Sequence, residues 1–352
     1  MALSTIQNNS FADTAVHGYR NRIINGAMTI DQRNNGSSVT VNTGNAFYSL
    51  DRYFGAGTTS AGVFTIQQSS TAPTGFNSSA LVTVTTSATP SGTDNYRFNQ
   101  AVEGFNVADL NWGSANAQAV TLSFWVRSSL TGTFGGALQN SDKSRTYPFS
   151  YTISSANTWE QKIITVAGDT TGTWLTNNGI GVLVVWCLGA ADRLGPANAW
   201  SSTRYDGVTG QVNLIGTNGA TFYITGVQLE IGSEATPFEH RSYGDELRRC
   251  QRYYEKSIGA YYSSGMAGDT TTGEIYSNIN FKVTKRATPT VIIRDTSGTA
   301  NKINRLNIGV SNTSNQTQNS GGFNVDGISY VASNSGVAAN SLVFGYAADA
   351  EL

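Results

Sequence analysis

The sequence predicts an all-β protein built from two packed sheet layers, followed by one short helix and a second, smaller β-domain. Three observations support this prediction. The chain has 38 glycines in 352 residues, its apolar runs are too short for helices, and clusters of Thr, Ser, Asn and Gly separate these runs. Many short strands joined by turns produce this pattern.

The apolar pattern of individual segments predicts which strands lie inside the two packed sheets and which lie at their edges. Residues 120–127 alternate Val, Leu, Phe and Val with Thr, Ser, Trp and Arg, which predicts a strand with one core face. Residues 182–188 are apolar on both faces and predict a central, covered strand, whereas 159–166 mixes apolar and charged positions as an outer strand does. In 221–231 the apolar phase slips at Gly226, which predicts a β-bulge.

One segment has a helical period. Tyr243–Lys256 is the densest charged stretch, and Leu247, Cys250 and Tyr254 form a narrow apolar stripe. We therefore predict a linking helix over 243–257. The period of two returns afterwards and predicts a C-terminal β-domain over 258–352.

The remaining boundaries follow from composition. Residues 1–20 are polar with little hydrophobic period, and we interpret them as an attachment arm that orders against another protein. The first β-domain then covers 21–242. All six tryptophans lie between Trp112 and Trp200, so the two β-domains bury different kinds of core.

Charge and hydropathy argue against several partners. Only 13% of residues are charged, the formal net charge is −1, and no long basic run is present. We therefore expect no nucleic-acid binding. No run approaches the ~18 apolar residues of a membrane span, and the N-terminus has no secretory pattern. The expected protein is made in a cytosol and does not insert into membranes.

The inventory of reactive groups predicts no catalytic residue, no metal site and no cofactor. His17 and His240 are the only histidines, and there is no GxSxG elbow, P-loop or HExxH motif. Two carboxylates are enough to hydrolyse a glycosidic bond, and candidates stand in strand or turn contexts at Asp51, Asp142, Asp206 and Glu230. Their simplest interpretation is solvated charge or turn capping. A structural calcium stays possible, although no Asp-rich ligand loop is present. Cys187 and Cys250 are expected to be buried thiols.

Aromatic residues give the more informative candidates, because neutral sugars are held by stacking on rings among neutral hydrogen-bonding groups. Trp125 lies on the polar face of its strand beside Arg127, and Trp112, Trp200 and Tyr205 lie in polar loops. We predict these five residues as a glycan-binding set. The alternative for each tryptophan is packing in a core or a subunit interface.

Several motifs resemble virion proteins of tailed bacteriophages. They are NRIINGAMTIDQRNN at 21–35, SLDRYF at 49–54, TLSFWVRSS at 121–129, TFYITGVQLEIGSEATPFEHRSYGDELRRCQRYYEKS at 221–257 and the terminal AADAEL at 347–352. The resemblance covers most of the chain from Asn21 onward. It implies a carbohydrate-binding-module-like jelly roll in the tryptophan-rich region and a role as a tail fibre, minor tail or other appendage protein.

The expected function is therefore a virion subunit, assembled in the bacterial cytoplasm as a homotrimer. Its arm contacts other virion proteins and its β-domains bind host-surface carbohydrate. A purely structural head-decoration, tail or baseplate adaptor is the alternative, and a polysaccharide depolymerase is a third, weaker possibility.

Overall fold

The computed structural model describes residues 19–58, 61–257, 261–263, 267–269, 274–275, 277–295, 297, 299–306, 316–333 and 341–352. The chain divides into two compact units, Met1–Tyr243 and Gly244–Leu352. The predicted arm over 1–20 lies outside the described residues except for Tyr19 and Arg20.

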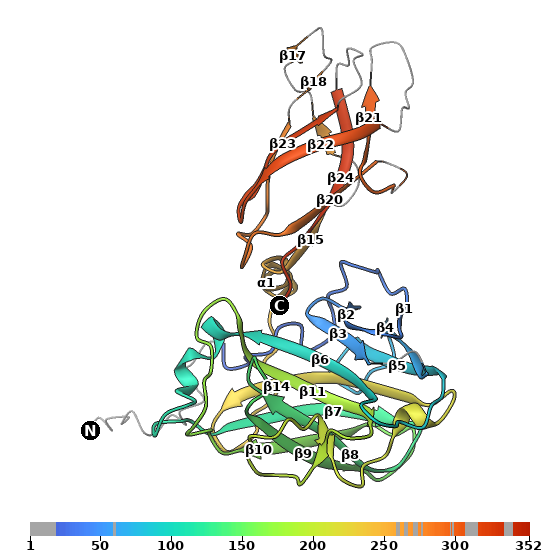
Figure 1. Ribbon diagram of the computed structural model, residues 1–352, viewed down its shortest axis with the longest axis vertical. Helices are drawn as coiled ribbons and strands as arrows, with labels where there is room; N and C mark the ends of the chain where they lie inside the picture. Colours follow the sequence, from blue (N-terminus) through green and yellow to red (C-terminus); the bar gives the residue numbers. More distant parts are fainter. Residues whose placement is uncertain are drawn as a thin grey trace, which may run out of the picture. The chain divides into compact units, whose positions relative to one another are not determined.

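The first unit contains two antiparallel sheets packed face to face (Figure 1). In spatial order, sheet A consists of β1 (Val39–Val41), β4 (Val63–Ser69), β5 (Ser79–Thr86), β14 (Thr221–Ile231), β7 (Val120–Ser128) and β10 (Glu160–Val166). Sheet B consists of β2 (Gly44–Tyr48), β3 (Tyr53–Gly57), β6 (Asn95–Glu103), β11 (Ile180–Ala190), β8 (Gly132–Gln139) and β9 (Thr146–Ile153). The chain passes repeatedly between the sheets, so the fold is the jelly-roll sandwich expected from the sequence.

Aromatic rings from both sheets fill the space between them. Phe124 of β7 meets Trp186 of β11 edge-to-face, with ring centroids 5.8 Å apart. Phe134 of β8 stacks on Phe222 of β14 at 6.3 Å. Such aromatic pairs contribute about 0.5–1.5 kcal/mol each beyond area burial.

The predicted strand alternation is confirmed in β7. The side chains on its core face are fully buried, namely Val120, Leu122, Phe124 and Val126. The all-apolar strand β11 is central, between β6 and β8, and is buried on both faces. Its outer face is covered because a later segment crosses it, with Gly207 lying directly on Cys187.

The predicted bulge at Gly226 is also confirmed. The pairing of β14 with β7 shifts register between Thr225 and Gln228, and Gly226 has a φ of +60° that favours glycine. The shift turns Val227 and Leu229 into the core and leaves Gln228 on the opposite face.

Short elements connect the strands of this unit. They are the 3₁₀ helices η3 (Gly104–Asn106), η4 (Ala108–Leu110) and η5 (Leu214–Gly216), and the parallel pair β12 (Leu194–Gly195) and β13 (Gly207–Val208).

The second unit begins within the helix α1 (Tyr243–Gln251) and is otherwise β-structure. Its strands are β15 (Tyr254–Lys256), β16 (Tyr261–Ser263), β17 (Ala267–Asp269), β18 (Glu274–Ile275), β19 (Ser277–Asn280), β20 (Thr290–Arg294), β21 (Lys302–Leu306), β22 (Gln316–Phe323), β23 (Gly327–Ser333) and β24 (Ser341–Asp349). β24 pairs with β15, β16, β20 and β21. A small separate core surrounds Ile293, Phe344 and Tyr346.

The helix is shorter than the predicted 243–257. It ends at Gln251, because Tyr254 leaves the helical stripe and pairs with Asp349 in β15. The Nζ atom of Lys285 donates to the carbonyl of Gln251 at 2.6 Å, which satisfies one of the carbonyls left over at a helix end. In the part of the chain that the structure describes, every helix falls short of the length and hydropathy that a membrane span requires.

Candidate functional site

An aromatic row crosses the outer face of sheet A. Arg127 of β7 pairs in register with Tyr223 of β14, and Trp159 directly precedes β10 on the other side of β7. The Trp159 and Tyr223 rings meet at 6.1 Å. The guanidinium carbon of Arg127 lies 5.0 Å from the centre of the Tyr223 ring, a favourable cation–π distance. All three side chains are half-buried.

Trp125 continues the row toward the bulge. It lies opposite Gln161 of β10 and Thr225 of β14. A Cβ atom on Gly226 would stand 2.6 Å from the Phe76 ring and 3.0 Å from the Trp125 ring, so both rings lie against this glycine. We call Phe76, Trp125, Trp159 and Tyr223 the outer aromatic strip.

The indole N–H groups of the tryptophans differ in their partners, and that of the fully buried Trp186 has none. Those of Trp112 and Trp200 donate to backbone carbonyls at 2.7 Å each. Among the described residues, those of Trp125 and Trp159 have no hydrogen-bond partner, although both side chains reach solvent. The strip tryptophans thus retain a donor without a protein partner on a half-buried ring.

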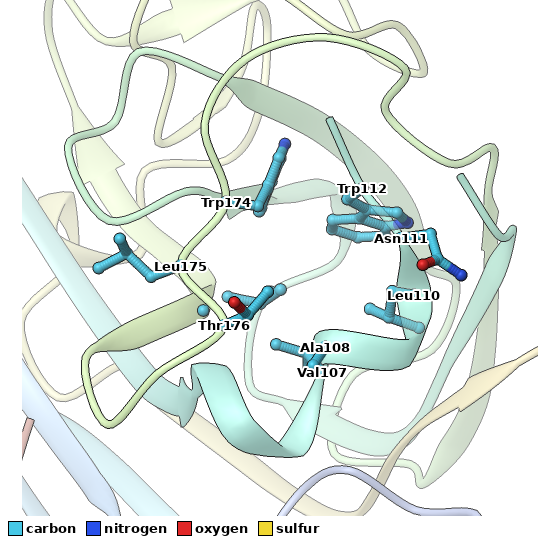
Figure 2. Close-up of a pocket in the computed structure, with 10 residues that line it drawn as sticks. Val107, Ala108, Leu110, Asn111, Trp112, Trp174, Leu175 and Thr176 are labelled. Atoms are coloured by element: carbon cyan, nitrogen blue, oxygen red, sulfur yellow. The ribbon is translucent and has the colours of Figure 1, made fainter. Parts of the chain in front are cut away.

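Trp112, Trp174 and Trp200 form a separate tryptophan cluster at one end of the sandwich. All three rings pack edge-to-face, with centroids 4.6–5.4 Å apart. Figure 2 shows the small cavity beside Trp112 and Trp174, whose volume is about 30 Å³. Ligand pockets usually measure roughly 300–1,000 Å³, so this cavity is too small for a sugar ring. The geometry of Trp112 and Trp200 is that of packing.

A bidentate ion pair supports the tryptophan cluster. Arg145 donates to both carboxylate oxygens of Asp169 at 2.7 Å, and the Trp174 indole donates to the same carboxylate at 3.3 Å. Burial raises the pKa of Asp169, but the hydrogen bonds from Arg145 and Thr171 outweigh it and the net pKa is lowered.

Tyr205 belongs to neither group. It lies in the segment that crosses the outer face of sheet B, with its ring packed directly on Gly195. Its carbonyl accepts a hydrogen bond from the Gln139 side chain at 2.8 Å. The next residue, Asp206, is fully buried.

Three arginines converge on Asp206. Arg204 approaches its carboxylate to 3.1 Å, Arg193 to 3.7 Å and Arg97 to 3.8 Å. Asn95 and Gln139 each donate to the same carboxylate at 2.6 Å. We call these six residues the Asp206 cluster.

Burial and charge act in opposite directions in the Asp206 cluster. Burial raises the pKa of Asp206, but the charges of Arg97 and Arg204 outweigh it and hold the pKa below its ordinary value. Burial lowers the pKa of Arg97, and Asp206 opposes this effect only in part. Asp206 is therefore an ionised, structural carboxylate.

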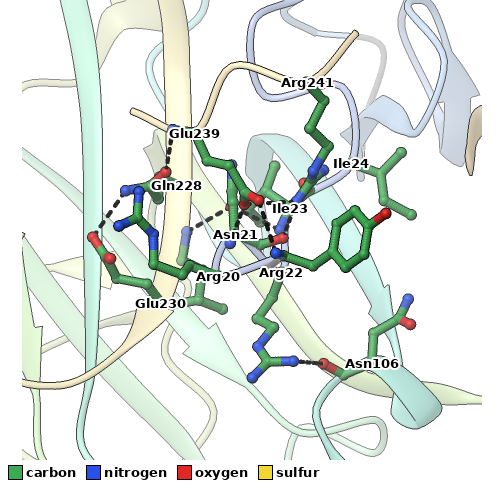
Figure 3. Close-up of polar contacts among 12 residues, drawn as sticks. Arg20, Asn21, Arg22, Ile23, Ile24, Asn106, Gln228, Glu230, Glu239 and Arg241 are labelled. Atoms are coloured by element: carbon green, nitrogen blue, oxygen red, sulfur yellow. Dashed lines mark hydrogen bonds and ion pairs between the residues drawn. The ribbon is translucent and has the colours of Figure 1, made fainter. Parts of the chain in front are cut away.

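The segments 21–35 and 221–257 meet at the chain junction of the first unit, shown in Figure 3. Asn21 accepts from the Leu229 N–H at 3.1 Å and donates to Val227 at 3.0 Å. Its own N–H donates to Glu239 at 2.7 Å. Arg241 donates to the carbonyls of Asn21 and Ile23. We call Asn21, Glu239 and Arg241 the junction clamp, and its contacts are structural.

The other carboxylates considered from the sequence are held by the chain itself. Asp51 accepts from the Gln32 backbone and side chain, and Glu230 accepts from Thr236. Asp142 lies in an exposed turn, where its carboxylate accepts from the backbone N–H and the hydroxyl of Ser144. The described residues contain no group of three or more His, Cys, Asp or Glu suited to a metal ion.

The structure thus separates the five predicted site residues. Trp125 and Arg127 lie together on sheet A, Trp112 and Trp200 pack on each other, and Tyr205 lies over sheet B. Sequence reasoning missed Phe76, Trp159 and Tyr223 as site residues. The signal for Trp159 was present, because it begins the segment whose mixed pattern predicts an outer strand.

Comparisons with known proteins give structural similarities alone. No protein-family model and no curated protein matches the sequence. A bacteriophage CBA120 tailspike protein 4 domain is similar with a TM-score of 0.32 and 12% identity, over 60% of this chain and 22% of that one. A putative sugar binding protein from Bacteroides thetaiotaomicron is similar with a TM-score of 0.35 and 11% identity, over 60% of this chain and 100% of that one. A family 11 carbohydrate-binding module from Clostridium thermocellum is similar with a TM-score of 0.30 and 11% identity, over 55% of this chain and 97% of that one.

Proposed function

We propose that the protein is a tailed-phage appendage subunit of the virion that attaches to host-surface glycan through the outer aromatic strip. The motif resemblance supports the virion role. The free indole N–H groups and half-buried rings of Trp125 and Trp159 carry the binding role. A sugar stacks its C–H face on such a ring while its hydroxyls accept from the indole.

The adjoining residues suit a neutral or weakly polar glycan. Gln161 lies beside the rings and supplies a neutral amide donor and acceptor, and Arg127 adds one cationic donor group. The strip extends over three neighbouring strands of sheet A, so we expect binding to several sugar units along a chain.

The binding test uses an array of bacterial surface polysaccharides, probed with wild type and with Trp125→Ala and Trp159→Ala. We expect each variant to lose tenfold or more in affinity for the glycans that wild type binds. Phe105→Ala is the matched control, because Phe105 is an aromatic residue 60% exposed outside the strip. Equal binding by all four proteins would overturn the glycan role of the strip.

The assembly part of the proposal is tested separately. We propose a homotrimer that contacts other virion proteins through residues 1–20. Light scattering at micromolar concentration should give three 37.4 kDa chains. A monomer would contradict the trimer and leave the glycan test unaffected.

One observation favours a purely structural adaptor instead. Ile163, on the same face of sheet A, is 54% exposed, and exposed apolar side chains beside aromatic rings also occur at subunit contacts. A particle map with the strip covered by another protein would select this alternative.

A further inference from the structure

The strands of sheet A carry few charges, and one of these charges has no opposite partner. The six strands contain four charged residues, namely Arg127, Glu160, Lys162 and Glu230. Lys162 and Glu160 form an ion pair at 2.6 Å. Glu230 is buried and accepts from Thr236. Arg127 is therefore the charged residue of these strands that lacks an ion pair within the described part of the chain.

Strand register keeps the carboxylates of sheet A away from the Arg127 guanidinium. Glu230 pairs with Thr121 of β7, six positions from Arg127 on the same face of the sheet. A strand rises about 3.3 Å per residue, so the two side chains lie roughly 20 Å apart, which is beyond the Debye length of about 8 Å at physiological salt. Glu160 pairs with Val126, whose side chain faces the core, so its carboxylate starts from the other face.

The Arg127 side chain is held in place before any ligand arrives. Its Nε donates to the carbonyl of Asn157 at 2.9 Å, and its guanidinium carbon lies 5.0 Å from the centre of the Tyr223 ring. Neither contact uses Nη1 or Nη2, and these two groups have no protein partner among the described residues. A guanidinium ordered in this way loses little further entropy when it binds an anion.

The side chains around Arg127 offer mainly hydrogen-bond donors. Indole and guanidinium groups donate and cannot accept, and the indole N–H groups of Trp125 and Trp159 have no partner among the described residues. Gln161, opposite Trp125, adds a neutral amide that can also accept. A ligand that fits this surface must therefore bring acceptors. A carboxylate brings two oxygens in one plane, which match the parallel N–H groups of a guanidinium.

We propose that the outer aromatic strip selects glycans that carry a sugar carboxylate, which Nη1 and Nη2 of Arg127 bind between Trp159 and Tyr223. Arg127 is then the specificity-determining residue of the strip. This inference rests on the proposed glycan role of the strip and refines its ligand, because neutral sugar units lie on the rings and one acidic unit lies at Arg127.

The experiment uses the array of bacterial surface polysaccharides, with each uronate-containing polysaccharide printed beside its carboxyl-reduced form. Reduction turns the carboxylate into a primary alcohol and leaves the rest of the chain unchanged. We expect wild type to bind the acidic forms at least about fivefold more tightly, by a margin that shrinks as salt rises. Equal binding of acidic and reduced forms would overturn the proposal. Tighter binding of sulfated polysaccharides than of uronates would show that the anion is not a carboxylate.

Arg127→Gln tests the assigned residue, because it removes the charge and keeps a polar side chain. It should bind acidic and reduced forms within twofold of each other. Lys162→Gln is the matched control, since it makes the same change in net charge on the neighbouring strand β10, where Lys162 is paired with Glu160. It should keep the preference of wild type. Equal loss of the preference in both variants would show that net charge, and not Arg127, selects the acidic forms.

Arg127→Lys separates charge from geometry. It keeps the positive charge but loses the parallel N–H groups and the bond from Nε to Asn157, so the acid preference should fall several-fold without disappearing. Melting temperatures show whether each variant is folded. If Arg127→Gln does not fold, the wild-type comparison of acidic and reduced forms and the Arg127→Lys variant still test the proposal. A full preference in folded Arg127→Lys would overturn the role of the two Nη groups.

Failure of this inference can be told apart from failure of the proposed function. If wild type binds acidic and reduced forms equally, and Trp125→Ala and Trp159→Ala weaken both, the strip binds glycan and the acid selectivity alone is wrong. If neither tryptophan variant changes the binding of either form, the glycan role of the strip is wrong as well.

Discussion

The rings of Trp159 and Tyr223 meet edge-to-face, 6.1 Å apart at 69°, although they come from opposite neighbours of β7. The strand between them contributes Arg127, which lies over the Tyr223 ring. The strip is thus a product of sheet pairing, and its rings are fixed by neighbouring strands and not by a loop.

The tryptophans should differ in their effect on stability. Trp112→Ala removes two ring contacts and a buried N–H bond, so the free energy of unfolding should fall by about 3–4 kcal/mol. Trp125→Ala removes a half-exposed ring and should cost about 1 kcal/mol. Urea unfolding of both variants measures the difference, and equal losses would contradict the assignment of Trp112 to packing.

Gly226→Ala should disturb the strip through the backbone. The added Cβ meets the Phe76 and Trp125 rings at 2.6 and 3.0 Å, at a φ of +60°. We expect a loss of about 2 kcal/mol and weaker binding of array glycans. Gly219→Ala is the matched control, because Gly219 has a φ of +75° but open space around it. It should lose about 1 kcal/mol and bind normally.

The Arg145–Asp169 pair should make stability depend on pH. The folded-state pKa of Asp169 is lowered, so its stabilisation is fully present above the unfolded pKa of about 3.9 and is lost as pH falls through the folded value. Asp169→Asn should cost about 2 kcal/mol at pH 7. Thermal unfolding from pH 7 to 2.5 should show that the difference in stability between Asp169→Asn and wild type becomes smaller below about pH 4. A stability difference that stays constant with pH would show that the charge of Asp169 is not what stabilises the fold.

A buried ion pair should show strong coupling in the second unit. Lys285 lies 2.9 Å from Glu255, and both side chains are 0% exposed. Removing one partner leaves a buried charge, so Lys285→Met or Glu255→Gln alone should cost about 3–5 kcal/mol. The double variant should cost clearly less than the sum of both. Additive losses in chemical unfolding would show that the two charges do not interact.

Local patterns predicted the first unit well because its strands carry strong alternation. The core face of β7 and the bulge at Gly226 follow from residues adjacent in sequence. The helix end was wrong because Tyr254 fits a helical stripe, while its pairing with Asp349 depends on a strand almost a hundred residues later.

The site was predicted only where one strand determines it. Alternation places Trp125 and Arg127 on one outer face, but the contact of Arg127 with Tyr223 depends on the register between strands. Trp112 and Trp200 appear in separate polar loops, and only the folded chain brings them together. The Asp206 cluster was missed because its arginines, spread between Arg97 and Arg204, have no motif spacing.

The junction clamp determines how the sandwich responds to mechanical force. Glu239 binds the backbone N–H groups of Tyr19 and Asn21, and Arg241 binds the carbonyls of Asn21 and Ile23. The segments that enter and leave the sandwich are therefore tied directly to each other. Tension applied between Tyr19 and Arg241 loads these few contacts first, and the twelve strands lie outside the path of the force. Pulling on the two ends of this unit would therefore stretch the clamp before it distorted either sheet.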